Sequence, residues 1–308
     1  MAGKSRERTE RAEEALISGE LKILTLPPGK TRSAEVLDAS KEKTALFVPK
    51  SILFEAAGFS QSSFSPDVLV TRDVTSVLAT IFQHGAVANR YGAGGLEQDP
   101  TRQQIIIYTL VVCNEHLLWY QRATKENLKT VDPKHHGDPR LQGRFSVGFG
   151  GHKTRDDISI AEEELMFLKD LLPVIRGGLG RMLGLNHGFL QEAQEELGIK
   201  RHDLKDLALL GAFYDARFED PFVDIQVGWV HTGVVAVIEV DPDSLEHLTY
   251  KLREIADAWW VPLKDIQKEL EKKQSDYAGG QGPKVESWTE VVLREFWPDF
   301  LQKIKSGN

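Results

Sequence analysis

Apolar residues along this chain follow two kinds of pattern, short runs of strand type and longer stretches with helical spacing. Residues 104–113 are dominated by β-branched and aromatic side chains, and residues 117–122 form a second run after three polar residues. A short polar break between two such runs predicts a β-hairpin. Similar runs predict strands at residues 145–149, 208–214, 226–240 and 257–263, the third of them with a bend or turn at Thr232 and Gly233.

Helical spacing of apolar residues predicts five helices, at residues 158–175, 189–197, 243–255, 264–273 and 286–305. We expect Gly198 to cap the second of them. Residues 1–20 alternate Lys or Arg with Glu and contain little to bury, which is typical of a solvated helix or a frayed end. The pattern therefore predicts an α/β fold in which an N-terminal extension, residues 1–100, packs on a body made of residues 101–308.

Composition excludes several classes of protein. Of the 308 residues 41% are hydrophobic and 27% are charged, which excludes disorder for most of the chain. Lys and Arg total 38 against 46 Asp and Glu, and the formal charge of −8 argues against a nucleic-acid polymer or an anionic membrane as partner. We see no apolar stretch of spanning length and no secretion signal, so we expect a cytoplasmic protein. The single cysteine, Cys113, lies in an apolar run, where a buried, inert thiol is expected.

The predicted helix at residues 189–197 concentrates acidic side chains on one face and apolar side chains on the opposite face. The acidic face consists of Glu192, Glu195 and Glu196. Faces of this kind are commonly only solvated. Neighbouring like charges repel one another, however, so the arrangement is destabilising unless a cation occupies it, and Mg²⁺ prefers oxygen ligands of this type. The pattern thus predicts either a solvated surface or a Mg²⁺ site.

The residues around this helix resemble the signature of the Nudix (MutT-like) hydrolases, G-x5-E-x7-R-E-U-x-E-E-x-G-U, in which U is aliphatic. Residues 191–199 (QEAQEELGI) match its second half except at the first position. Residues 146–152 (SVGFGGH) are similar to the S-I-G-I-G-G-H motif of a branch described as MutT-family phosphoesterases. Weaker matches extend the resemblance over roughly residues 100–290, and they lie at residues 120–122, 141–144, 259–263 and 286–288.

This resemblance implies a Nudix-like α/β/α sandwich with a mixed sheet. It also implies a metal-dependent hydrolase that cleaves a phosphoanhydride (diphosphate) bond in a nucleoside diphosphate derivative or a similar phosphorylated small molecule. The carried-over metal ligands for Mg²⁺, or alternatively Mn²⁺, are Glu192, Glu195 and Glu196 with the carbonyl of Gly150 or Gly151. Glu195 and Glu196 would be the principal catalytic residues. A homodimer is common among such proteins.

Two positions depart from the family signature. Gln191 replaces its arginine, and by the family's spacing Leu183 replaces its upstream glutamate, so the pair that braces the helix in the family is lost. Alternatively, the insertion between Gly151 and Gly188 shifts the register, and one of the glutamates at 162–164 supplies the carboxylate. The departures motivate a competing hypothesis, a non-catalytic nucleotide-binding or regulatory protein on a Nudix fold. A structural protein with a solvated acidic helix is a third.

Substrate phosphates would also need cations beyond the metal. Between residues 115 and 155 the chain has eight Lys or Arg against four Asp or Glu, a local reversal of its overall charge. Such a segment is often only solvated, but Arg122 and Arg144 end or precede strands next to the glycine motif, and arginine suits bidentate phosphate contacts. His152 follows the glycine pair and either contacts phosphate or caps the strand. The general base stays open among Glu219, Asp220, Asp224 and Glu239.

Overall fold

The computed structural model describes residues 44–91, 94–124, 141–153, 197–199, 203–217, 227–242, 255–280 and 284–306. The first 43 residues and almost all of three predicted helices, at residues 158–175, 189–197 and 243–255, lie outside this part of the chain. The described residues form two compact units. The first comprises the described residues of 1–108, 150–190 and 207–236, and the second those of 109–149, 191–206 and 237–308.

Antiparallel strands form the frame of the first unit. Strand β1 (Thr44–Pro49) pairs with β4 (Ala86–Asn89) and also with the start of β5 (Arg102–Cys113). Strand β3 (Val68–Thr71) pairs with β2 (Ser60–Gln61) and with the end of β9 (Leu204–Asp215). The remaining elements that bear on the site are η1 (Leu96–Gln98), β8 (Gly148–His152), η3 (Val227–Val230) and β10 (His231–Val240).

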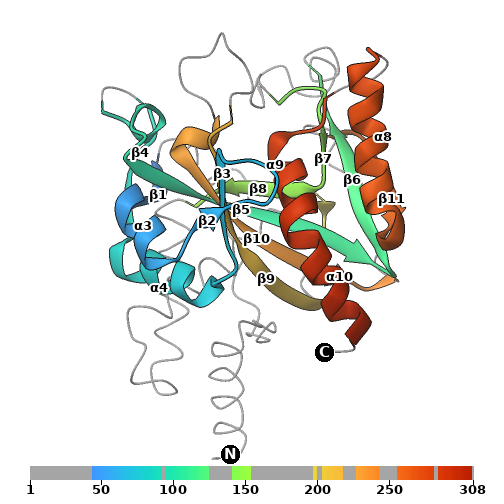
Figure 1. The fold of residues 1–308 in the computed structure, drawn as a ribbon, viewed down its shortest axis with the longest axis horizontal. Helices are drawn as coiled ribbons and strands as arrows, with labels where there is room; N and C mark the ends of the chain where they lie inside the picture. The colour runs from blue at the N-terminus through green and yellow to red at the C-terminus, as the bar shows by residue number, and fades with distance from the viewer. Residues whose placement is uncertain are drawn as a thin grey trace, which may run out of the picture. The chain divides into compact units, whose positions relative to one another are not determined.

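Two helices, α3 (Lys50–Ala56) and α4 (Val74–His84), pack against one another and against β1 in the first unit (Figure 1). The sequence of α4 accounts for its position. Asp73 precedes its first residue and accepts a hydrogen bond from the Ser76 amide at 2.9 Å, which satisfies one of the free donors of the first turn. The apolar residues that it buries have helical spacing, so one face of α4 joins the core, and they are Val74, Val77, Leu78 and Ile81.

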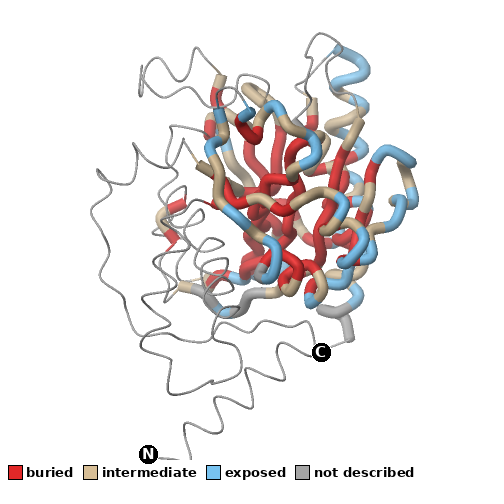
Figure 2. Tube along the Cα trace, turned by 90° about the vertical axis from the view of Figure 1, so that its left-hand side faces the viewer, coloured by how far each residue is buried: buried red, intermediate tan, exposed pale blue. Residues whose placement is uncertain are grey.

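The second unit contains the predicted hairpin. Strand β6 (His116–Arg122) pairs with the end of β5 at Val112 and Cys113, and the turn consists of Asn114 and Glu115. Both turn residues have positive φ, 45° and 59°, as a two-residue hairpin turn of type I′ requires. The hairpin predicted from the two apolar runs is therefore confirmed. Strand β5 is buried along nearly its whole length and belongs to the buried interior, which is red in Figure 2.

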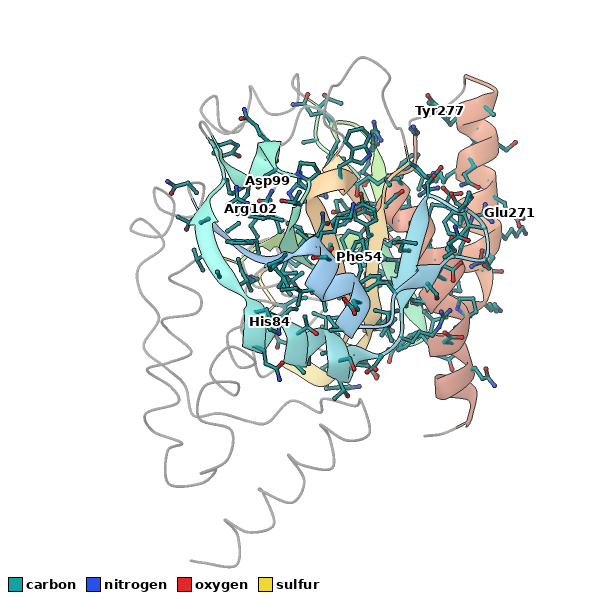
Figure 3. The ribbon with its side chains drawn as sticks, turned by 60° about the vertical axis from the view of Figure 1, so that its left-hand side comes forward. Phe54, His84, Asp99, Arg102, Glu271 and Tyr277 are labelled. Atoms are coloured by element: carbon teal, nitrogen blue, oxygen red, sulfur yellow. The ribbon has the colours of Figure 1, made fainter. Side chains whose placement is uncertain are left out.

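Strand β6 is flanked by β7 (Phe145–Ser146) and β11 (Ile255–Pro262), both antiparallel to it. Trp119 of β6 stacks on Trp259 of β11 with ring centroids 6.5 Å apart. The chain then forms η5 (Leu263–Asp265) and helix α8 (Ile266–Ala278), which contacts β11 and carries the exposed Glu271 and Tyr277 on its outer face (Figure 3). The helix predicted at residues 264–273 is therefore confirmed with a shifted start and a later end.

One prediction about local structure needs correction. The predicted turn at Thr232 and Gly233 is absent, because both residues lie inside β10. A Cβ on Gly233 would lie 2.6 Å from the Phe213 ring, so this glycine makes room for a packed aromatic side chain. The helix predicted at residues 286–305 is confirmed as one unbroken helical run, in which α9 (Ser287–Val291) leads through a π-helical segment, η6 (Val292–Phe296), into α10 (Trp297–Ser306). Pro298 lacks an amide donor for the regular helical bond, which explains a local change of winding here.

The mixed α/β class predicted from the sequence is confirmed by these strands and helices. Among the described residues no helix is both long enough and apolar enough to cross a bilayer. The predicted division into an extension at residues 1–100 and a body at residues 101–308 stays a prediction.

Candidate functional site

Three side chains that could bind a metal converge in the first unit. Glu97 comes from η1, His152 is the last residue of β8, and His231 is the first residue of β10. The Nε2 atoms of the two histidines lie 2.9 Å apart. The Glu97 Oε1 atom lies 3.9 Å from Nε2 of His152 and 3.7 Å from Nε2 of His231. The three ligand atoms therefore surround a common point, and we call these residues the Glu-His-His cluster.

The side chains of the cluster are mostly buried but retain some exposure to solvent. Side-chain exposure is 19% for Glu97, 18% for His152 and 4% for His231. Burial lowers the pKa of His152 well below its ordinary value, and electrostatic interactions with His231, Arg90 and Lys153 lower it further, with Glu97 opposing them. His152 is therefore neutral at pH 7 and can present a nitrogen lone pair.

Glu97 is ionised in this setting. Burial alone would raise the pKa of its carboxyl, but the interactions with His231 and with the Arg90 guanidinium outweigh burial and hold the pKa well below its usual range. Arg90 donates hydrogen bonds from Nε at 3.1 Å and Nη2 at 2.9 Å, both to Oε1 of Glu97. The backbone assists, since the Glu97 amide donates to the Arg90 carbonyl at 3.0 Å. A carboxylate and a neutral imidazole are thus held in ligand-ready protonation states.

Buried polar contacts position His231. The side chain of Gln103, which is fully buried in β5, donates to the Trp229 carbonyl at 2.8 Å and accepts from the Thr232 hydroxyl at 3.1 Å. These two bonds hold Trp229 and Thr232, which lie on either side of His231 at the start of β10. Arg102 holds the segments on both sides of η1, because its Nε lies 2.6 Å from Asp99, which follows η1, and its Nη2 donates to the carbonyl of Gly94, which precedes η1 (Figure 3).

The glycine motif that precedes His152 has a structural requirement. A Cβ on Gly150 would lie 2.2 Å from the Ile107 carbonyl oxygen, so only glycine allows β8 to approach β5 this closely. Gly151 is the next residue of the strand and is half-buried. The Lys153 carbonyl then accepts from the Leu46 amide at 2.7 Å. The strand that carries His152 is therefore fixed on both sides of the histidine.

The predicted acidic metal ligands Glu192, Glu195 and Glu196 lie outside the described residues. The three residues that follow them are described. Leu197 is helical and buried, Gly198 has a φ of 70°, and Ile199 is 1% exposed. Gly198 therefore has the left-handed conformation of the glycine cap that the sequence predicts after residue 197.

Arg122 and Arg144, predicted to bind substrate phosphate, lie in the second unit. The Nε of Arg122 donates to Oε1 of Glu286, a residue whose side chain is 4% exposed. Glu286 also accepts from the Ser146 hydroxyl at 2.8 Å. The backbone of Arg144 accepts from the Arg122 amide at 2.9 Å. Both arginines thus belong to one local network, and their role toward phosphate stays a prediction.

Of the Glu-His-His cluster, the sequence analysis singled out only His152. Glu97 and His231 are 55 and 79 residues away from it along the chain, and neither belongs to a motif with metal-ligand spacing. No local pattern could have assembled them, because strand pairing within the first unit brings them together.

No family model matches the chain. The curated protein YmaB of Bacillus subtilis (strain 168) is 24% identical over 200 residues, which cover 65% of this chain and 74% of YmaB. The crystal structure of Tm1382, a proposed Nudix hydrolase, is 16% identical, covers 81% of this chain and 96% of its own, and has a TM-score of 0.45. A mutT/nudix family protein from Listeria innocua is 15% identical, with coverage of 66% and 92% and a TM-score of 0.30.

Proposed function

We propose that this protein is a Nudix-type metal-dependent hydrolase that cleaves a diphosphate linkage in a phosphorylated small molecule. The observation that carries the proposal is the pair of motifs in family order, residues 146–152 followed by residues 191–199. Two described features support it. Gly150 occupies a position where a side chain would overlap the Ile107 carbonyl, and Gly198, which follows the helical Leu197, has the positive φ expected of a helix cap.

The chemistry needs a hard cation and a set of oxygen ligands. Glu192, Glu195 and Glu196 supply three carboxylates, and the glycine pair at residues 150–151 supplies a carbonyl, a donor set suited to Mg²⁺ with Mn²⁺ as the alternative. When bound, such an ion offsets charge on the phosphate oxygens and lowers the pKa of an attacking water. Arg122 and Arg144 would bind the remaining phosphate charge. We propose a cytoplasmic protein, with a homodimer as the expected assembly.

A product screen by mass spectrometry tests the proposal. Wild-type protein would be incubated with nucleoside diphosphate derivatives, dinucleoside polyphosphates and nucleotide cofactors, with and without Mg²⁺. Turnover should require the metal and should be lost in Glu195→Gln and Glu196→Gln. The matched control is Glu271→Gln, which removes an exposed carboxylate from α8 (Figure 3) and should leave turnover unchanged.

The competing function, nucleotide binding without hydrolysis, is motivated by Gln191 and Leu183 at two signature positions. It predicts ligand binding in saturating Mg²⁺ with no product of lower mass. Full activity of both Glu195→Gln and Glu196→Gln would instead show that the acidic helix is not the site.

A further inference from the structure

The Glu-His-His cluster differs in chemistry from the acidic helix. Two of its three ligand atoms are imidazole nitrogens, whereas Mg²⁺ is bound almost entirely by oxygen. Imidazole together with carboxylate suits borderline divalent ions such as Zn²⁺. We propose that Glu97, His152 and His231 form a second metal site, selective for Zn²⁺ or a similar transition-metal ion, whose side-chain ligands differ from those of the proposed Mg²⁺ site.

The distances agree with tetrahedral coordination. Bonds of about 2.0–2.1 Å at tetrahedral angles place two ligand atoms about 3.3 Å apart. The three separations in the cluster are 2.9, 3.7 and 3.9 Å, so they bracket this value. Side-chain movements of roughly half an ångström would complete the geometry. Three protein ligands leave one tetrahedral position for a water molecule or another exogenous ligand.

Charge and protonation favour the same ligand. The Nε2 atoms of His152 and His231 are 2.9 Å apart, which leaves room for only one proton between them. At least one of the two Nε2 atoms therefore presents a lone pair. The Glu97 carboxylate supplies negative charge. Both hydrogen bonds from Arg90 go to its Oε1 atom, so the acceptor positions left for an ion, among the roughly four that a carboxylate has, belong mainly to Oε2.

Residues next to the cluster hold its ligands in position by hydrogen bonds, as is usual around metal ligands. Arg90 orients the Glu97 carboxylate, and Gln103 fixes the entry into β10 from which His231 extends. Neither contact requires the acidic helix. The cluster can therefore be tested separately from hydrolysis.

The test uses the full-length protein, freed of metal by chelation and titrated with Zn²⁺, Co²⁺ or Mg²⁺. We expect one Zn²⁺ per chain at this site, a higher melting temperature with Zn²⁺, and the strong visible absorption of four-coordinate Co²⁺. Glu97→Gln, His152→Ala and His231→Ala should abolish the Co²⁺ band, and Arg90→Gln should weaken Zn²⁺ binding about 10–100-fold. The control is His84→Ala, which removes an exposed imidazole at the end of α4 (Figure 3) and should retain binding.

Zinc-edge X-ray absorption on the wild type adds a measurement that depends on no variant, and it should show two imidazoles at about 2.0–2.1 Å. Absence of imidazole scattering, or Zn²⁺ binding that survives His152→Ala and His231→Ala, would overturn the proposal. Glu196→Gln separates the two sites. Zinc binding that persists in Glu196→Gln supports the second site. Zinc binding that is lost in Glu196→Gln but kept in the Glu97, His152 and His231 variants would assign the ion to the acidic helix.

Discussion

Arg122 at the end of β6 donates its Nε to Glu286, the residue before α9, and so joins a strand to the start of the C-terminal helices within the second unit. The Glu286 carboxylate is nearly buried and also accepts from Ser146. A buried carboxylate that loses its cationic partner is strongly destabilising, since its charge is left uncompensated. The pair is therefore expected to stabilise this unit whatever Arg122 does toward a substrate.

We expect Arg122→Met to lower the free energy of unfolding by about 3 kcal/mol, measured by urea denaturation. Adding Glu286→Gln should recover part of this loss, because the uncompensated charge is then removed. The control is Arg294→Met, whose partner Glu290 forms a more exposed pair on one helix, and the expected cost is about 0.3–0.5 kcal/mol. Equal effects of the two single substitutions would contradict the prediction.

The close approach of β8 to β5 predicts that Gly150→Ala is poorly tolerated. The new Cβ would overlap the Ile107 carbonyl, and backbone cannot move as easily as a side chain, so the free energy of unfolding should fall by about 3 kcal/mol or more. Gly58→Ala serves for comparison, because that position has open space and only the strain of a positive φ, at a cost of about 1 kcal/mol. Thermal and urea unfolding would measure the stability of both variants. Gly150→Ala as stable as the wild type would contradict the prediction.

The cap of α4 predicts a pH-dependent contribution. Hydrogen bonds from the Ser76 side chain and amide lower the pKa of Asp73 below its ordinary value. The stabilisation is therefore complete above the unfolded-state pKa, about 3.9, and is lost as the pH falls through the folded-state pKa. Asp73→Ala should cost about 1 kcal/mol at neutral pH and progressively less in acid, measured by urea denaturation. Asp73→Ser is the control, because serine keeps a capping oxygen that does not titrate, and its stability relative to Asp73→Ala should not depend on pH. A cost of Asp73→Ala that is the same at all pH values would contradict the prediction.

Cys113 is buried, as the sequence predicts. Burial raises the pKa of its thiol, and the Glu239 and Asp241 carboxylates raise it further against the effect of Lys205. We expect iodoacetamide to modify this thiol slowly in the native protein and fully after unfolding, as followed by mass spectrometry. Ser51→Cys in a Cys113→Ala background places a thiol on the exposed face of α3 and should react at once. Fast native labelling of Cys113 would show that this region opens readily.

Local patterns in the sequence determined much of this protein. Two β-branched runs around a short polar break predict the β5–β6 hairpin, because apolar periodicity and turn length are local properties. Gly198 was identifiable as a helix cap and Cys113 as a buried thiol for the same reason. The Glu192, Glu195 and Glu196 face likewise follows from helical spacing alone, and it remains a prediction.

Only the tertiary structure decided which distant residues meet. Gly233 is predicted to lie in a turn, yet it lies within β10, where a side chain at this position would overlap the Phe213 ring. The sequence predicts that Arg122 binds substrate phosphate, and it gives no sign of the bond between the Arg122 guanidinium and Glu286, which lies far away in sequence. Glu97 and His231 carry no local signal, since strand pairing, and not sequence spacing, brings them to His152.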